Sequence, residues 1–178
     1  MKARELALAS VIAALYAITV YLFPMISFLL WQVRIADALM PLSMTLGYPA
    51  VLGLTIGCFL GNILAAPWGS SFLNFLDATL GSLINLVAGW LGYKLGYRAE
   101  RRRRVTVALA QAIIVSVGVG SYLKYLLLWA FNTDIPFLIS ILGVLPGSLI
   151  SIVVVGLPLS LAVQRALEGS GEKLFSKV

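Results

Sequence analysis

The sequence contains no histidine, a single cysteine and few charged residues, and these shortages limit what the chain can do. Metal sites and nucleophile–base pairs are built mainly from histidine and cysteine, so we expect no catalytic centre, no bound metal ion and no cofactor. No GxxxxGK[ST] stretch occurs, so an import pump built on this chain would need its energy from another subunit. The lone Cys58 excludes an intrachain disulfide and is expected to fill space.

Charged residues make up 11% of the 178-residue chain, well below the roughly 25% usual in soluble domains. Hydrophobic residues make up 61%, and the mean hydropathy is +1.00. Apolar runs of this length and number indicate an all-α integral membrane protein, which we expect in the cell membrane. We predict a single transmembrane domain over residues 1–178, a bundle of six helices. The expected helices are 5–23, 35–46, 50–66, 72–93, 106–131 and 137–163.

Basic residues outnumber acidic ones by 13 to 7, an excess that in a soluble protein can indicate nucleic-acid binding. Here they gather at the chain ends and in the arginine-rich run 94–104, which indicates membrane topology and no nucleic-acid partner. With both termini in the cytoplasm, every basic residue except Arg34 and Lys124 lies inside, while all three aspartates lie toward the outer side. The inner set includes Lys2, Arg4, Lys94, Arg98, Arg101, Arg102, Arg103, Arg104, Arg165, Lys173 and Lys177, with Glu172 among the inner glutamates. The arginine block is expected to anchor this topology, with contact to anionic membrane lipid as a second role.

Several polar residues fall near the predicted outer ends of the helices, where exposure to lipid would be costly. Arg34 and Asp37 stand three residues apart at a helix start, and Asp77 lies on a polar stripe that faces protein. At about 1.5 Å per helical residue, Asp77 reaches the same depth as Asn62 and Lys124 of neighbouring helices. We therefore expect a cavity open to the exterior, lined by aromatic faces and hydrogen-bonding groups. Its candidate substrate-binding residues are Arg34, Asp37, Asn62, Trp68, Asp77 and Lys124.

Structural roles remain open for the same residues. Arg34 and Asp37 can form an ion pair at the outer rim, and Asp77 and Lys124 can neutralise each other inside the bundle. Tryptophans near helix ends, here Trp68 and Trp129, are ordinarily part of interfacial belts, so stacking on a ligand is the rarer role.

Small residues repeat every four positions in two predicted helices, which lets neighbouring helices approach closely. The row in the third helix is expected to pack inside the chain. The row in the first helix either packs internally or forms a docking face for a partner subunit. The two rows are Ala9, Ala13 and Ala17, and Gly53, Gly57, Gly61 and Ala65.

Four stretches of the chain, in the same order, resemble the QueT family. They are VRIADALMP from Val33 to Pro41, GCFLGNILAAPWG from Gly57 to Gly69, FLDATLGSLINLVAG from Phe75 to Gly89 and LPGSLISIVVVGLPL from Leu145 to Leu159. Asp37 stands where an acidic residue is expected in the family. Ser148 follows Gly147 at a place where the family often has an acidic residue, and Ser148 joins the candidate substrate-binding residues.

The resemblance implies a substrate-binding S component of an energy-coupling factor (ECF) transporter, with its ligand site near the outer face. Such a component docks through small residues of its first helix onto a transmembrane coupling subunit driven by two ATPase subunits, and Ala9, Ala13 and Ala17 match that pattern. The implied cargo is a queuosine precursor, a 7-deazaguanine base. An aspartate, Asp37 or Asp77, would accept from its N–H edge, and Trp68 or Trp129 would stack on its ring.

Two alternatives to this function stay open. One is an S component for another vitamin-like compound, and the other is a non-transporting membrane scaffold in which the polar groups only hold helices together. A membrane enzyme would require a turnover that depends on Asp77. Ligand binding separates these possibilities, because a selectively bound compound stabilises the folded protein.

Overall fold

The computed structural model describes residues 1–28 and 30–169, and within these ranges all regular structure is helical. Lys173, Lys177 and Glu172, which we expected on the inner side, lie outside the described residues. Five helical stretches are long and apolar enough to cross a membrane. They are α1 (Ala3–Leu22), α4 (Tyr48–Ala65), α5 (Ser71–Gly96), α6 (Arg101–Phe131) and the continuous stretch of α7 (Phe137–Ser148), the π-helix η2 (Leu149–Gly156) and α8 (Leu157–Gly169).

The all-helical fold is confirmed, but five helices, and not six, reach spanning length in the described part of the chain. The expected second helix has the predicted bounds and consists of the 3-10 helix η1 (Ile35–Leu42) followed by α3 (Ser43–Leu46). At roughly 2.0 Å per 3-10 residue and 1.5 Å per α residue it extends about 22 Å, short of the ~30 Å hydrocarbon core. A helix this short is tolerated because most of its residues are buried in protein.

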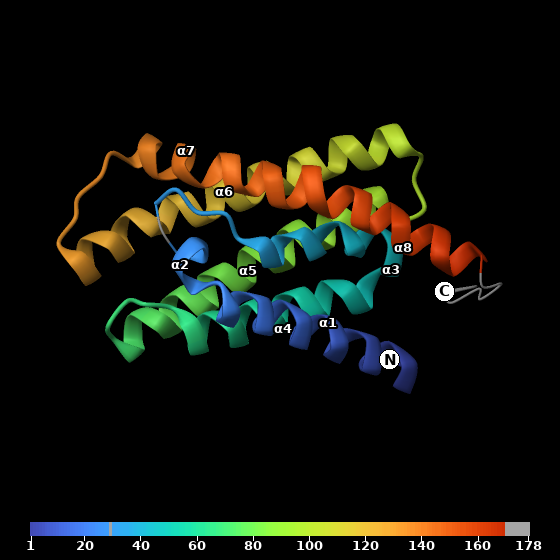
Figure 1. Cartoon of the computed structure of the whole chain (residues 1–178), viewed down its shortest axis with the longest axis horizontal. Helices are drawn as coiled ribbons and strands as arrows, with labels where there is room; N and C mark the ends of the chain where they lie inside the picture. Colours follow the sequence, from blue (N-terminus) through green and yellow to red (C-terminus); the bar gives the residue numbers. More distant parts are fainter. Residues whose placement is uncertain (29, 170–178) are drawn as a thin grey trace.

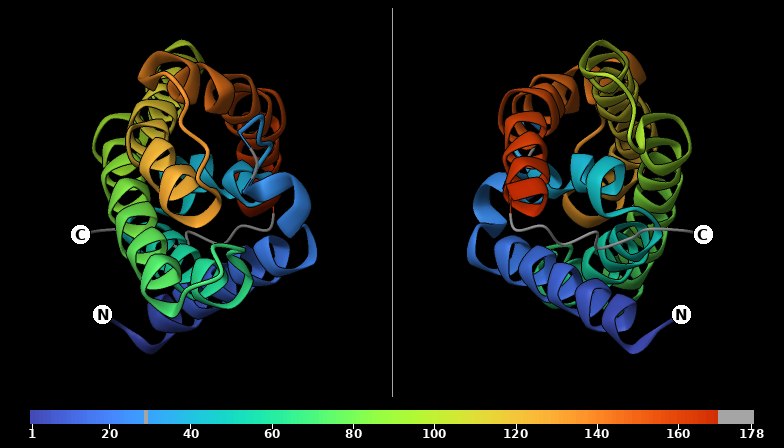
Figure 2. Two further views of the ribbon diagram at one scale, coloured as in Figure 1. Left: turned by 90° about the vertical axis from the view of Figure 1, so that its left-hand side faces the viewer. Right: turned by 90° about the vertical axis from the view of Figure 1, so that its right-hand side faces the viewer.

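The long helices run back and forth along the longest axis of the molecule (Figure 1). The start of α1, the α5–α6 turn and the end of α8 lie together at one end of the bundle, and the α4–α5 and α6–α7 connections lie at the other. Viewed along this axis, η1 and α3 lie inside the ring formed by the long helices (Figure 2). The arginine block therefore shares one end of the bundle with both termini of the described chain.

Glycine and proline set the breaks around this inner helix. Gly47 has a φ of 73°, a conformation that side-chain-bearing residues rarely adopt, and it ends α3. Pro49 then lies in the first turn of α4, where a missing backbone N–H costs nothing. On the other side of η1, Pro24 begins α2 (Pro24–Ser27), which turns the chain out of α1.

The glycine row of α4 packs on the alanine row of α1. A Cβ on Gly53 or Gly57 would lie 2.7 Å from the backbone oxygen of Ala9 or Ala13, so the two helices touch through their backbones. Ala9 and Ala13 are buried, and Ala17 is half-buried beside Gly61. The glycine row is thus internal packing, as predicted, but the alanine row is internal packing as well. Ala9 and Ala13 are not open to a partner, and their prediction as docking residues is wrong.

Candidate functional site

Arg34 and Asp37 lie in the bundle interior, where residues 30–34, which we call the extended segment, lead into η1. Arg34 caps this helix and Asp37 lies in its first turn, as their spacing predicts. Both side chains are buried, with 5% and 3% of their surface exposed. Tyr16 of α1 donates its hydroxyl to Asp37 Oδ1 at 2.5 Å, which fixes the carboxylate. Tyr16 was not among the predicted site residues. The available signal was its position three residues after Ala13, on the same face of α1, which is buried.

The guanidinium of Arg34 is shared among several weak partners. It donates to the backbone oxygen of Ser27 at 3.4 Å and to Cys58 Sγ at 3.9 Å, and its carbon lies 5.2 Å from the centre of the Phe28 ring. Within the described ranges Arg34 and Asp37 form no ion pair with each other, so the predicted rim ion pair is wrong. Arg34 is nevertheless close enough to both Asp37 and Asp77 for the charges to interact.

A small pocket lies beside these two residues, between the extended segment, α6 and α7. It is lined by the polar side chains of Gln32, Arg34, Asp37 and Ser148 and by the apolar side chains of Val115, Val119 and Val144. The empty space is about 210 Å³ including its mouth, but the centre of a water molecule can occupy only about 10 Å³ of it. That is close to the least a single water needs, so a larger ligand requires the walls to separate. Ser148, another of the predicted residues, lines this pocket together with Arg34 and Asp37.

The extended segment that carries Gln32 packs tightly on α7. A Cβ on Gly147 would lie only 1.7 Å from the backbone oxygen of Gln32, and one on Gly143 would lie 2.5 Å from that of Leu30. Only glycine allows this approach. Gly143 and Gly147 thus form the surface of α7 on which this segment packs beside the pocket.

Asp77 forms a second polar cluster, in which both carboxylate oxygens have a partner. Trp68 donates its indole N–H to Oδ2 at 3.0 Å, and Tyr122 of α6 donates its hydroxyl to Oδ1 at 2.7 Å. Asn62 lies beside them and donates to the Asp77 backbone oxygen at 3.5 Å. The structure thus brings together Asn62, Trp68 and Asp77, three of the residues that the sequence predicted.

Phe28 links the two clusters. Its ring meets Trp68 edge to face at a centroid distance of 6.1 Å and also contacts the Arg34 guanidinium. Trp68 packs on Phe131 as well and is 2% exposed, so it is fixed in the bundle and not part of an interfacial belt. Trp129, the other stacking candidate, is 57% exposed and lies apart from these contacts.

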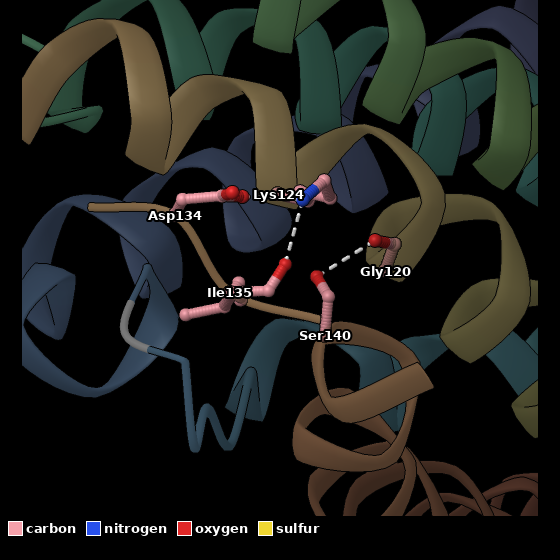
Figure 3. A network of polar contacts seen from close by, with 5 residues as sticks. All are labelled: Gly120, Lys124, Asp134, Ile135 and Ser140. Carbon is pink, nitrogen blue, oxygen red and sulfur yellow. Dashed lines mark hydrogen bonds and ion pairs between the residues drawn. The ribbon is translucent and has the colours of Figure 1, made fainter. Parts of the chain in front are cut away.

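Lys124 points toward Asp134 and Ile135 in the α6–α7 connection (Figure 3). Its ammonium group forms an ion pair with Asp134 and donates to the backbone oxygen of Ile135 at 2.8 Å. It thereby ties the end of α6 to the start of the α7 segment, where Ser140 also bonds to the Gly120 oxygen at 2.7 Å. The expected pairing of Lys124 with Asp77 is therefore wrong, and its place among the substrate-binding residues has no support in the geometry.

The arrangement offers hydrogen bonding without an evident reactive group. In residues 1–28 and 30–169, no three histidine, cysteine, aspartate or glutamate side chains gather to hold a metal ion. The aspartates accept hydrogen bonds from tyrosine and tryptophan, and the pocket lining combines polar side chains with valines. Such a site can bind a small molecule that is flat or apolar on its faces and polar at its edge.

The family model described as QueT transporter matches residues 6–165, which is most of the chain. Neither the curated proteins nor the solved structures contain a match.

Proposed function

We propose, from the premise that the chain belongs to the QueT transporter family, that it is the substrate-binding S component of an ECF importer. Family membership makes the chain a membrane transporter and not an enzyme, as predicted. Its proposed cargo is a queuosine precursor, a 7-deazaguanine base, captured from outside the cell. Its proposed partners are a transmembrane coupling subunit and two ATPase subunits. The ATPase subunits would supply the energy from ATP, because this chain has no P-loop motif.

The observation that carries the proposal is the buried pocket beside Arg34 and Asp37. Two charged side chains with less than a tenth of their surface exposed are costly in a membrane protein unless they serve a site. Here they line a space that also contains Gln32 and Ser148. A planar heterocycle with a polar edge and apolar faces suits a lining that combines polar side chains with valines.

We place the termini in the cytoplasm and the site toward the exterior. The arginine block, Arg4 and Arg165 lie toward the end of the bundle where α1 begins and α8 ends, and a cytoplasmic location satisfies the positive-inside rule. Trp68 and the α6–α7 connection then lie toward the opposite end, which would face outward. In this orientation η1 and α3 serve as the sixth, shortened pass of the chain.

Docking to the coupling subunit needs a face of α1 other than the buried alanine row. Ala7, Ser10 and Ala14 lie on one stripe of α1 and are exposed. We assign this stripe to the partner, since small residues allow close helix approach. Ala14→Leu should abolish uptake in cells while leaving ligand binding intact, and Ala162→Leu, at an exposed alanine of α8, should leave both intact. Unchanged uptake in the Ala14 variant would remove this surface from the proposal.

Ligand-dependent thermal stability of the purified full-length chain tests the proposed function. A compound at a hundred times its Kd stabilises a protein by about 2.7 kcal/mol, so 7-deazaguanine should raise the Tm, and riboflavin, biotin and thiamine should not. Asp37→Asn should abolish the shift, whereas Asp134→Asn, at a carboxylate 68% exposed and outside the pocket, should keep it. A shift with another vitamin-like compound would reassign the cargo, and no shift with any compound would favour the scaffold alternative.

A further inference from the structure

Two buried hydrogen-bond donors in the pocket have no acceptor within the described chain. They are Nε2 of Gln32 and Nε of Arg34, on side chains that are 4% and 5% exposed. Both groups belong to residues that line the pocket, one on each side of Val33 in the extended segment. Leaving a buried donor unpaired is costly, so two such donors on residues that line one pocket indicate that a ligand supplies the acceptor.

An acceptor stands beside these donors. Asp37 lines the same pocket, and its Oδ1 already receives the Tyr16 hydroxyl. Its Oδ2 takes no hydrogen bond from any residue that the structure describes, so a carboxylate oxygen remains for a ligand N–H. The pocket thus presents two donors and one acceptor from three residues of one six-residue stretch, 32–37.

We propose that Gln32, Arg34 and Asp37 recognise a cyclic amide edge, in which a ring carbonyl stands next to a ring N–H. Gln32 and Arg34 donate to the carbonyl oxygen, whose two lone pairs match two donors, and Asp37 accepts from the adjacent N–H. Once the walls separate to admit the ring, Val115, Val119 and Val144 offer it apolar contacts. This inference rests on the proposed function and adds to it the part of the substrate that is read, with Gln32 as a specificity-determining residue.

The chemistry of the three groups makes the recognition selective. A ring without the carbonyl leaves both donors unpaired, and a ring with an amine in its place puts donors against donors. Sites built to hydrogen-bond a group discriminate strongly against analogues that lack it, because the site's own buried polar groups are then left without partners. Size alone would discriminate far less between rings of the same outline.

A comparison of two ligands on the full-length protein tests the inference. The probes are 7-deazaguanine and 2-amino-7-deazapurine, which has the same rings without the carbonyl and the neighbouring N–H. The wild-type chain should bind the first at least roughly 10-fold more tightly by calorimetry. Gln32→Ala should weaken 7-deazaguanine roughly 10- to 100-fold and change the affinity for the carbonyl-free ring much less. Asn85→Ala removes another buried amide with an unpaired nitrogen, outside the pocket lining, and should preserve the preference.

The outcomes distinguish the inference from the proposed function. If the wild-type chain binds both rings equally, or if Gln32→Ala weakens both equally or neither, recognition of the cyclic amide is wrong while the chain remains a 7-deazapurine-binding subunit. If the wild-type chain binds neither ring, the proposed cargo itself is wrong. The wild-type comparison needs no variant, so it decides the question even if Gln32→Ala fails to fold.

Discussion

Replacing Gly147 by alanine tests the packing that closes the pocket. The added Cβ would lie 1.7 Å from the Gln32 backbone oxygen, 2.7 Å from its carbonyl carbon and 3.0 Å from Val33 Cα. These are backbone atoms that cannot rotate away, so the segment must withdraw from α7 by more than about 1 Å. Overpacking of this kind costs about 1–3 kcal/mol. Gln32 and Arg34 belong to the displaced segment and would move with it, so we also expect the affinity for 7-deazaguanine to fall by roughly 10-fold or more.

The matched control for this variant is Gly89→Ala. Its Cβ would meet its nearest neighbours, on Leu54 and Val51, at 3.6 Å, an ordinary contact. Alanine is the better helix former by up to about 1 kcal/mol, so this variant should be at least as stable as the wild type. Thermal unfolding in detergent should show a Tm for Gly147→Ala lower by roughly 2–10 °C, since 1 kcal/mol is worth about 2–4 °C at this size. Equal Tm and affinity in the two variants would refute the close packing of the segment on α7.

Three further changes probe the polar contacts. Tyr16→Phe removes the hydroxyl that binds Asp37, so it should lower stability by about 1–3 kcal/mol and weaken ligand binding; unaltered melting and titration curves would contradict this. Lys124→Met should leave the affinity for 7-deazaguanine unchanged in the same titration, because Lys124 pairs with Asp134 outside the pocket, and a large loss would return it to the site. Arg104→Met should destabilise the chain by about 1–3 kcal/mol in thermal unfolding, because the buried guanidinium bonds to residues of α3 and α8, whereas the same change at the exposed Arg103 should have no effect.

The helices were the part of the structure that the sequence predicted best. Long apolar runs bounded by proline, glycine and arginine left little freedom, so the expected 72–93 and 137–163 correspond to α5 and to the stretch from α7 to α8. The stripe carrying Asp77 was also predicted to face protein, and Asp77 is 2% exposed. Periodicity determines such faces, because it depends only on the spacing of residues within one helix.

Partners across helices were predicted less well. Depth counting brought Asp77 and Lys124 to one level, but depth does not give the direction in which a side chain points. Asp77 accepts a hydrogen bond from Tyr122, which lies two positions before Lys124. Two residues correspond to a rotation of about 200°, so Tyr122 and Lys124 point to nearly opposite sides of α6. The alanine row was similarly ambiguous, since a small face fits a neighbouring helix of the same chain as well as it fits a partner.

Gln32 was missed for a different reason. It lies in an extended segment, for which no helical or strand period exists to indicate which side chains point inward. Its packing depends on Gly147, more than a hundred residues away in the chain. The available signal was a single glutamine two positions before Arg34. Without knowledge of the contact with Gly147, that signal carries little weight.

The π-helix η2 keeps the two halves of the last helical stretch in phase. Ser148 at the pocket and Ser160, which bonds to Arg104 and to the Pro41 oxygen, both point inward. In a regular α-helix twelve residues at about 100° each would set them about 120° apart around the axis. The wider turn of eight π-helical residues, at about 80° each, brings that offset down to about 40° or less. Deleting one residue there would rotate α8 relative to α7, so the wide turn lets one continuous helical stretch line the pocket at one level and bind Arg104 at another.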